Sequence, residues 1–418
     1  MDSPAKDPRE LFALLQLEET AEAESYQQIL VELEKEAFKP NNLKSFLRIL
    51  GEQPAALRGH FYKEILVRRR NSIGALKTLE KHLRWCLNRD RKDAHSSLEA
   101  IGESKALPGL FRLVSLTRDA TVAREIIARI RTYDYEHIRS AILYALRSED
   151  KKLQSFGLHM ARRVTDPTLI EPLLKFYLQQ TENTIKANAQ RVLLEALTPD
   201  DREIVLGWLR DKNGDVRLLG VRAAQRLADR KFIPDLVRLV LVDARTRVSA
   251  ASVLLSFAQL GIITFVPDGA PEITGIITKA KRQPLLAVLE ELLHNDNRVL
   301  REIGLRFLRL LPEERTLEKT VVYLAQRERT APVRSAAIEL LATYQREQAL
   351  DMIVEILSDP AASARNSSLA QATEELLAKL VDGETLAQIE AKIEKRREER
   401  EEALNRFVGD FEAWREQL

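Results

Sequence analysis

The side chains whose types and spacing could support chemistry are those of His82 and Cys86, four residues apart in a predicted helix. At this spacing a thiol and an imidazole lie one helical turn apart, where a thiolate–imidazolium pair would form a nucleophile. Leu83, Trp85 and Leu87 surround the pair. We therefore expect a buried, unreactive thiol beside a partly buried histidine.

Elsewhere the sequence shows no recognisable catalytic or metal-binding pattern. The six histidines never stand four residues apart, so no helical pair of zinc ligands is formed. The sequence has neither a glycine-rich phosphate loop nor a Gly-x-Ser-x-Gly turn. We expect no enzymatic activity, no metal and no cofactor.

Basic residues gather in residues 37–92, where fourteen Lys and Arg outnumber four Asp and Glu. Basic and aromatic side chains together suit a phosphate-bearing or acidic partner. The alternative is intramolecular, because residues 1–36 carry a net charge of −7 that would neutralise the cluster. The candidate partner-binding residues of this segment are Arg68, Arg69, Arg70, Lys77, Lys81, Arg84, Trp85 and Arg89.

A ladder of basic residues recurs along the rest of the chain in steps of 30 to 33 residues, with one step of 54. Gln154 occupies the one position without a cation. A small residue such as Gly220 follows three residues later, one helical turn away, so that a neighbouring backbone can come close. A period near 30 without a glycine-aromatic strand signature indicates an α-solenoid. The ladder comprises Arg124, Lys186, Arg217, Arg247, Arg301, Arg334 and Arg365.

An acidic residue stands in the turn before nearly every ladder position, and Asp211 before Arg217 is an example. Residues 211–217, followed by Gly220 and Leu227, resemble the HEAT-repeat family in its short bacterial form, related to phycobilisome-lyase-type repeats. The resemblance covers roughly residues 98–380. It implies an all-α solenoid of stacked helix pairs, in which ladder cations bond turn acids of adjacent repeats. Gln154, and Arg329 in the turn before Arg334, depart from this pattern and predict two weaker joints.

These patterns predict six segments. Residues 1–36 form an acidic helix that begins near residue 8, and residues 37–97 form divergent, basic helical pairs that cap the array. HEAT-like repeats occupy 98–260 and 285–381. A Pro- and Gly-punctuated insertion, either a hairpin or an ordered loop, occupies 261–284. A charged amphipathic helix occupies 382–418.

Two of these segments supply further candidate partner-binding residues. Phe265 and Asp268 lie in the insertion, and Phe407, Phe411 and Trp414 lie in the C-terminal helix. Insertions into solenoids often occupy the binding face, although a spacer over a seam between two arrays is the alternative. The C-terminal helix either covers the last repeat or projects and docks to a partner or another copy.

The net charge of +2 favours neither nucleic acid nor membrane as a partner. The sequence has a single cysteine, no signal-peptide pattern and no long apolar run. We therefore expect a cytoplasmic protein without a membrane span. We expect a protein-binding scaffold or adaptor whose partner and oligomeric state stay open. The first alternative is nucleic-acid binding through residues 37–92. The second, a bilin-lyase-like enzyme, depends on repeat type alone.

Overall fold

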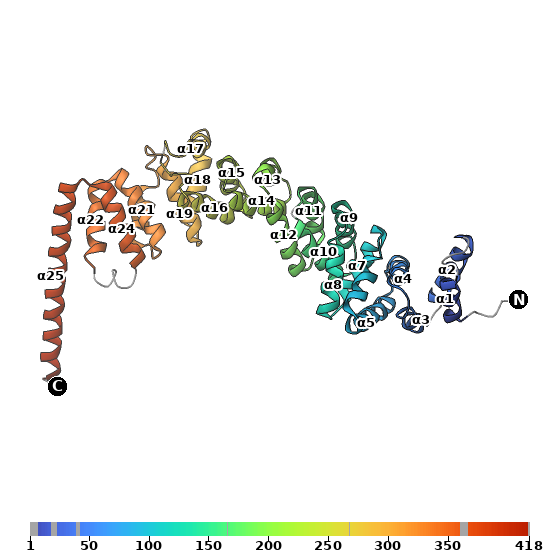
Figure 1. Cartoon of the computed structure of the whole chain (residues 1–418). Helices are drawn as coiled ribbons and strands as arrows, with labels where there is room; N and C mark the ends of the chain where they lie inside the picture. Colours follow the sequence, from blue (N-terminus) through green and yellow to red (C-terminus); the bar gives the residue numbers. More distant parts are fainter. Residues whose placement is uncertain are drawn as a thin grey trace. The chain divides into compact units, whose positions relative to one another are not determined.

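The computed structural model describes residues 7–17, 23–38, 42–164, 166–266, 268–359 and 367–416, and the regular structure in these ranges is entirely helical. Figure 1 shows the helices in order along the chain. The chain divides into two compact units, Met1–Leu197 and Thr198–Leu418. In each unit consecutive helices pair, and neighbouring pairs pack side by side. Each unit is therefore an α-solenoid, as the period of the basic ladder predicts.

The first unit opens with divergent helices and continues with regular pairs. The helices α4 and α5 both pack on α6, and α5 also packs on α3. From α7 onward the pairs are α7 with α8, α9 with α10, and α11 with α12. The helices are α1 (Pro8–Leu17), α2 (Ala23–Phe38), α3 (Leu43–Leu50), α4 (Ala55–Arg68), α5 (Ile73–Arg89), α6 (Arg91–Glu99), η1 (Ser104–Ala106), α7 (Leu107–Leu116), α8 (Ala120–Ile130), α9 (Tyr135–Leu146), α10 (Lys151–Val164), η2 (Pro167–Leu169), α11 (Ile170–Gln179) and α12 (Asn183–Ala196).

The second unit repeats the arrangement with α13 and α14, α15 and α16, α18 and α19, α20 and α21, and α22 and α24. The second helices of these pairs also contact one another, α14 with α16 and α16 with α19. The helices are η3 (Pro199–Asp201), α13 (Arg202–Leu209), α14 (Gly214–Leu227), η4 (Arg230–Phe232), α15 (Ile233–Val242), α16 (Arg247–Gln259), α17 (Pro271–Ile277), α18 (Arg282–Leu293), α19 (Arg298–Arg309), α20 (Glu318–Arg327), α21 (Ala331–Tyr344), α22 (Arg346–Leu357), α24 (Ser367–Leu380) and α25 (Gly383–Glu416).

Small residues allow the two helices of a pair to approach closely. A Cβ atom added at Gly220 would lie 2.8 Å from the backbone nitrogen of Leu209, and one at Gly157 would lie 2.8 Å from the Cβ of Ala145. Both distances are too short for an unstrained side chain, so these positions admit only hydrogen. Gly157 therefore fixes the close approach of α9 and α10, and Gly220 that of α13 and α14.

Polar caps begin several helices at the turns that the sequence marks. The carboxylate of Asp119 accepts hydrogen bonds from the backbone of Thr121 and Val122, and the amide oxygen of Asn213 accepts one from Asp215. These bonds satisfy donors that have no partner within the helix. These turn residues therefore help to determine where α8 and α14 start.

Two segments differ from the prediction. The acidic segment contains two helices, α1 and α2, which pack against each other, where one long helix from residue 8 was expected. The insertion contains a short helix, α17, and no strand among its described residues, so the hairpin, one of the two predicted alternatives, is not formed. The carboxylate of Glu272 on α17 bonds the guanidinium of Arg230 through two atom pairs, at 2.5 and 3.1 Å, which ties the insertion to the preceding repeat.

Candidate functional site

A pocket of about 600 Å³ lies between α3 and α5 in the first unit, and we call it the α3–α5 pocket. From α5 it is lined by Lys81 and Trp85, both predicted as partner-binding residues, and by Thr78 and His82. Its α3 wall was missed by sequence reasoning. The residues of that wall are Lys44, Ser45, Leu47 and Arg48.

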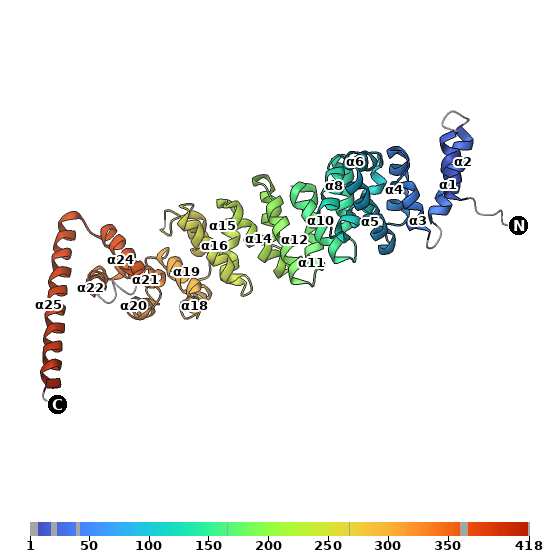
Figure 2. The same cartoon turned by 60° about the horizontal axis from the view of Figure 1, so that its bottom comes forward.

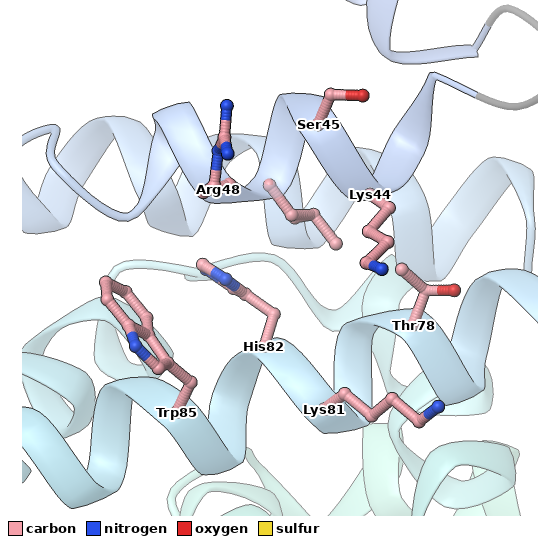
Figure 3. Close-up of a pocket in the computed structure, with 8 residues that line it drawn as sticks. Lys44, Ser45, Arg48, Thr78, Lys81, His82 and Trp85 are labelled. Carbon is pink, nitrogen blue, oxygen red and sulfur yellow. The ribbon is translucent and has the colours of Figure 1, made fainter.

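The packing of α3 on α5 explains how the pocket forms. Phe46 and Leu50 are buried, while Lys44 and Arg48 on the same helix stay exposed, as the amphipathic period of a short surface helix requires. Lys44 points from α3 toward Thr78 on α5, and His82 and Trp85 point into the gap between the helices (Figure 3). The edge of the indole ring lies against Gly51, where an added Cβ would be only 2.6 Å from Trp85.

A buried arginine supports the helices around the pocket. The guanidinium of Arg58 on α4 donates to the carbonyl of Gly51 at 3.1 Å and to the Ser97 hydroxyl at 2.9 Å, and it also bonds Asp93 on α6. Only 3% of Arg58 is exposed. A buried, fully bonded arginine fixes the end of α3 relative to α4 and α6.

His82 lines the pocket, Cys86 follows it one helical turn later on α5, and both are buried. Burial, together with the positive charge of Arg58, lowers the pKa of His82 to about 4. Burial raises the pKa of the Cys86 thiol, although the Tyr62 hydroxyl lies 3.8 Å from its sulfur. The sulfur of Cys86 lies 3.5 Å from Nε2 of His82, but the two pKa shifts favour the neutral thiol and the neutral imidazole. This geometry opposes a thiolate–imidazolium pair.

Several cations of the basic cluster have partners within the chain. Arg68 bonds Glu34 of α2 and Glu64 of its own helix, both at 2.7 Å. Arg84 bonds Asp119 at 2.6 Å. Only Glu34 among these acids belongs to the acidic segment, so the pairing predicted by the intramolecular interpretation is seen for Arg68.

The other members of the cluster are arranged differently. The guanidinium of Arg70 lies 5.4 Å from the ring centre of Tyr144, and that of Arg89 lies 5.4 Å from the ring centre of Trp85. Arg69 is half-buried just after α4, and Lys77 is exposed on α5. Only Lys81 and Trp85 of the predicted set line the α3–α5 pocket.

The insertion residues do not form a surface site together. Phe265 is 4% exposed and its ring centre lies 6.3 Å from that of Phe307 on α19. Phe265 is therefore a core residue, and its prediction as a partner-binding residue is wrong. Asp268 is exposed beside it.

The C-terminal helix α25 has an anchored half and an exposed half. Ile389 and Ile393 are buried, and Arg397 donates two hydrogen bonds, at 3.1 and 2.9 Å, to the carbonyl of Leu357 at the end of α22. From Glu398 to Val408 every residue is exposed, and α25 extends beyond α22 and α24 (Figure 1, Figure 2).

The exposed half of α25 carries large apolar side chains at helical spacing, which we call the α25 stripe. Leu404, Phe407, Val408 and Trp414 are 61%, 68%, 44% and 55% exposed. Their spacing places them along one side of the helix. Phe411 would continue the same side, but its side chain lies outside the described residues.

Three ladder cations of the second unit, Arg217, Arg247 and Arg301, bond across repeats. Arg217 bonds Asp243 in the next turn at 2.7 Å and also donates to the carbonyls of Asp211 and Lys212, both at 2.9 Å. Hydrogen bonds from Arg217 and Thr246 hold the pKa of Asp243 at about 2. Arg217 therefore joins its own turn to the following repeat.

Two joints use acids that the sequence pattern did not assign. Arg247 bonds Glu291 on α18, at 2.5 Å, across the insertion. Arg301 bonds Glu328 at 2.8 and 3.2 Å. Because Glu328 precedes Arg329 by one residue, the weak joint predicted from Arg329 is wrong.

Among the described residues, Arg124, Gln154 and Arg334 form no such ion pair. Arg124 is exposed, and Gln154 donates to the carbonyl of Ser148 at 2.7 Å. The ammonium of Lys186 lies 5.1 Å from the ring centre of Tyr177. Arg334 is half-buried and donates to the carbonyl of Ala325 at 2.9 Å, and burial lowers its pKa. Arg365 lies outside the described residues.

None of the described helices combines the length and hydrophobicity that a bilayer crossing requires.

No family model matches the chain, and no curated protein matches it. Three solved structures show limited similarity. An engineered protein has 17% sequence identity and a TM-score of 0.31, over 94% of this chain and 98% of its own. Kap121p bound to Nup53p has 13% identity and a TM-score of 0.36, over 90% of this chain and 45% of its own. She4p has 14% identity and a TM-score of 0.38, over 93% of this chain and 68% of its own. Similarities this low carry no argument about function.

Proposed function

We propose that the protein is a non-catalytic interaction scaffold that binds another protein through α25. The observation that carries this proposal is the α25 stripe, whose four described apolar side chains are between 44% and 68% exposed. A continuous apolar row on a soluble helix is unfavourable in water and is typical of a helix that inserts into a groove or pairs with another helix.

The surroundings of the stripe also suit a protein partner. Charges of both signs flank it, and Glu402 pairs with Arg406 on another side of the helix, 3.4 Å apart. Mixed charges beside an apolar row are common in helices that recognise a helical partner, whereas phosphate binding favours an excess of cations. The anchored half of α25 supplies the rigid attachment that such a helix needs.

The proposal is tested by capture of a partner from the native host with the full-length protein as bait. We expect one partner protein to co-purify in stoichiometric amount and to stay bound after nuclease treatment. Its binding should be lost in the variant that combines Leu404→Asp with Phe407→Asp. The matched control combines Glu402→Gln with Arg406→Gln, which changes the same helix away from the stripe and retains the partner. Light scattering measures whether the stripe is instead covered by a second copy.

Two results would contradict the proposal. The first is a partner that is recovered equally with the stripe variant, and the second is material recovered only when nuclease is omitted. A dimer that the stripe variant converts to a monomer would assign the stripe to self-association instead. Circular dichroism of each variant checks that α25 stays helical.

A further inference from the structure

We propose that the α3–α5 pocket binds a short acidic peptide segment of a partner protein, with an apolar side chain seated between the helices. This site lies in the first unit and is separate from the α25 stripe in the second. The proposal therefore goes beyond the function proposed above, and each can fail without the other.

The charge of the pocket is the first argument. Its three cations, which we call the pocket cations, are Lys44, Arg48 and Lys81, and no carboxylate lines the pocket with them. Within the described ranges none of the three forms an ion pair. Nearby cations such as Arg68 and Arg84 do have carboxylate partners. An acidic ligand would supply the charges that the pocket cations lack.

The apolar part of the pocket is the second argument. Leu47 from α3 and Trp85 from α5 line it, and Trp85 is 44% exposed. The imidazole of His82 is neutral near pH 7 because burial lowers its pKa to about 4. A wall of this kind favours burial of an aliphatic or aromatic side chain. Its volume of about 600 Å³ accommodates a few side chains, which matches a peptide segment.

The surroundings favour a peptide over a nucleic acid. A nucleic-acid backbone needs a track of cations that continues beyond one pocket. Here the adjacent Arg84 is already paired with Asp119, so it does not extend the pocket cations into such a track. The Trp85 ring already stacks with His82, with ring centres 5.9 Å apart, and has Arg89 beside it. A stacked base would have to displace one of these contacts.

The two walls of the pocket allow a graded test with the full-length protein. The probe is an array of acidic octapeptides with one Leu, Phe or Trp among Asp and Glu, and a matched array in which Asn and Gln replace the acids. We expect acidic peptides to bind and their amide counterparts not to bind. Combining Lys44→Glu with Lys81→Glu reverses one charge on each wall and should weaken binding about tenfold or more.

Control variants separate this site from general electrostatics. Combining Lys105→Glu with Lys152→Glu makes the same change of net charge at exposed positions of the first unit, and it should weaken binding less than about twofold, since exposed charges are screened by solvent and salt. Combining Lys44→Gln with Lys81→Gln should give an intermediate loss. The α25 stripe variant should bind the peptides as the unmodified protein does.

Three results would overturn the proposal. The first is that no acidic peptide binds. The second is that the pocket variant and the control variant lose peptide affinity equally. The third is that a single-stranded oligonucleotide of the same charge binds more tightly than the peptides and that the pocket substitutions abolish its binding. Because all substituted lysines are exposed, we expect every variant to keep its helical circular dichroism spectrum, which makes each of these results interpretable.

Discussion

Arg217 connects two repeats through one guanidinium, because it bonds a carboxylate ahead of it and two carbonyls behind it. A charge-assisted hydrogen bond contributes about 1.5–3 kcal/mol when its surroundings exclude water. The role of Arg217 as an inter-repeat contact, instead of a ligand for a partner, stays a prediction that substitution can test.

Arg217→Ala is expected to lower the free energy of unfolding by about 1–3 kcal/mol, because it removes these bonds and leaves Asp243 without its arginine. Urea denaturation followed by circular dichroism measures the change. Arg226→Ala removes an exposed arginine from the same helix and should have little effect. Equal effects of the two substitutions, or partner binding lost without a change in stability, would reverse the assignment.

His82 makes the stability of the fold depend on pH. Its pKa is about 4 in the folded protein, against an ordinary value near 6.5. Between these values the unfolded chain binds a proton that the folded protein does not, so stability is fully present above about pH 6.5 and is lost as the pH falls toward 4. The contribution of His82 to this loss is roughly 3 kcal/mol.

We therefore expect the free energy of unfolding to fall less between pH 7 and pH 4.5 in a His82→Gln variant than in the unmodified protein. Denaturation curves of both proteins at the two pH values measure this difference. Because both proteins contain the same carboxylates, the contribution of those groups to the pH dependence cancels in the comparison. The same pH dependence in both would show that His82 is accessible to protons in the folded state.

At the scale of single elements, α25 is held to the repeats by few contacts. Ile389 and Ile393 are buried, Lys392 pairs with Asp351 at 2.9 Å, and Arg397 bonds the end of α22. Combining Ile389→Ala with Ile393→Ala should release the anchored half, because each change removes buried apolar surface and costs about 2–4 kcal/mol.

Hydrogen–deuterium exchange measures this release as faster exchange in residues 383–397, with α14 as an unaffected reference. The matched control combines Leu404→Ala with Phe407→Ala, which removes apolar side chains from the exposed half of the same helix. Exchange in residues 383–397 should not change in that control. If both pairs of substitutions accelerate it equally, α25 is not anchored through Ile389 and Ile393.

At the scale of the whole molecule, the all-α solenoid architecture was predictable because a period near 30 residues survives even where individual residues vary. The α5 side of the candidate pocket was also predictable, since Lys81 and Trp85 stand in a segment rich in basic residues. The α3 side was not, because the contact between α3 and α5 joins residues more than thirty positions apart and leaves no periodic signal. The only local indication of this wall was a pair of cations, Lys44 and Arg48, one helical turn apart beside Leu47.

Two other differences have separate causes. Glu328 stands six residues before Arg334, the same spacing as Asp211 before Arg217, so the acid that pairs with Arg301 could have been recognised from the sequence. The burial of Phe265 against Phe307 depends on how the insertion folds back over the neighbouring repeat. This burial is not visible in residue types alone, because it depends on a tertiary contact.

The division of α25 into an anchored and an exposed half gives the helix the geometry of a rigid spacer. At 1.5 Å per residue, its end lies about 28 Å from Arg397 along the axis. Each residue also turns the helix by about 100°, so the direction in which the stripe faces depends on the number of residues after that anchor. An insertion of one residue there would turn the stripe away from its original direction, while an insertion of four would nearly restore it and move it about 6 Å outward. The length of this segment therefore sets both the distance and the orientation at which a bound protein is held.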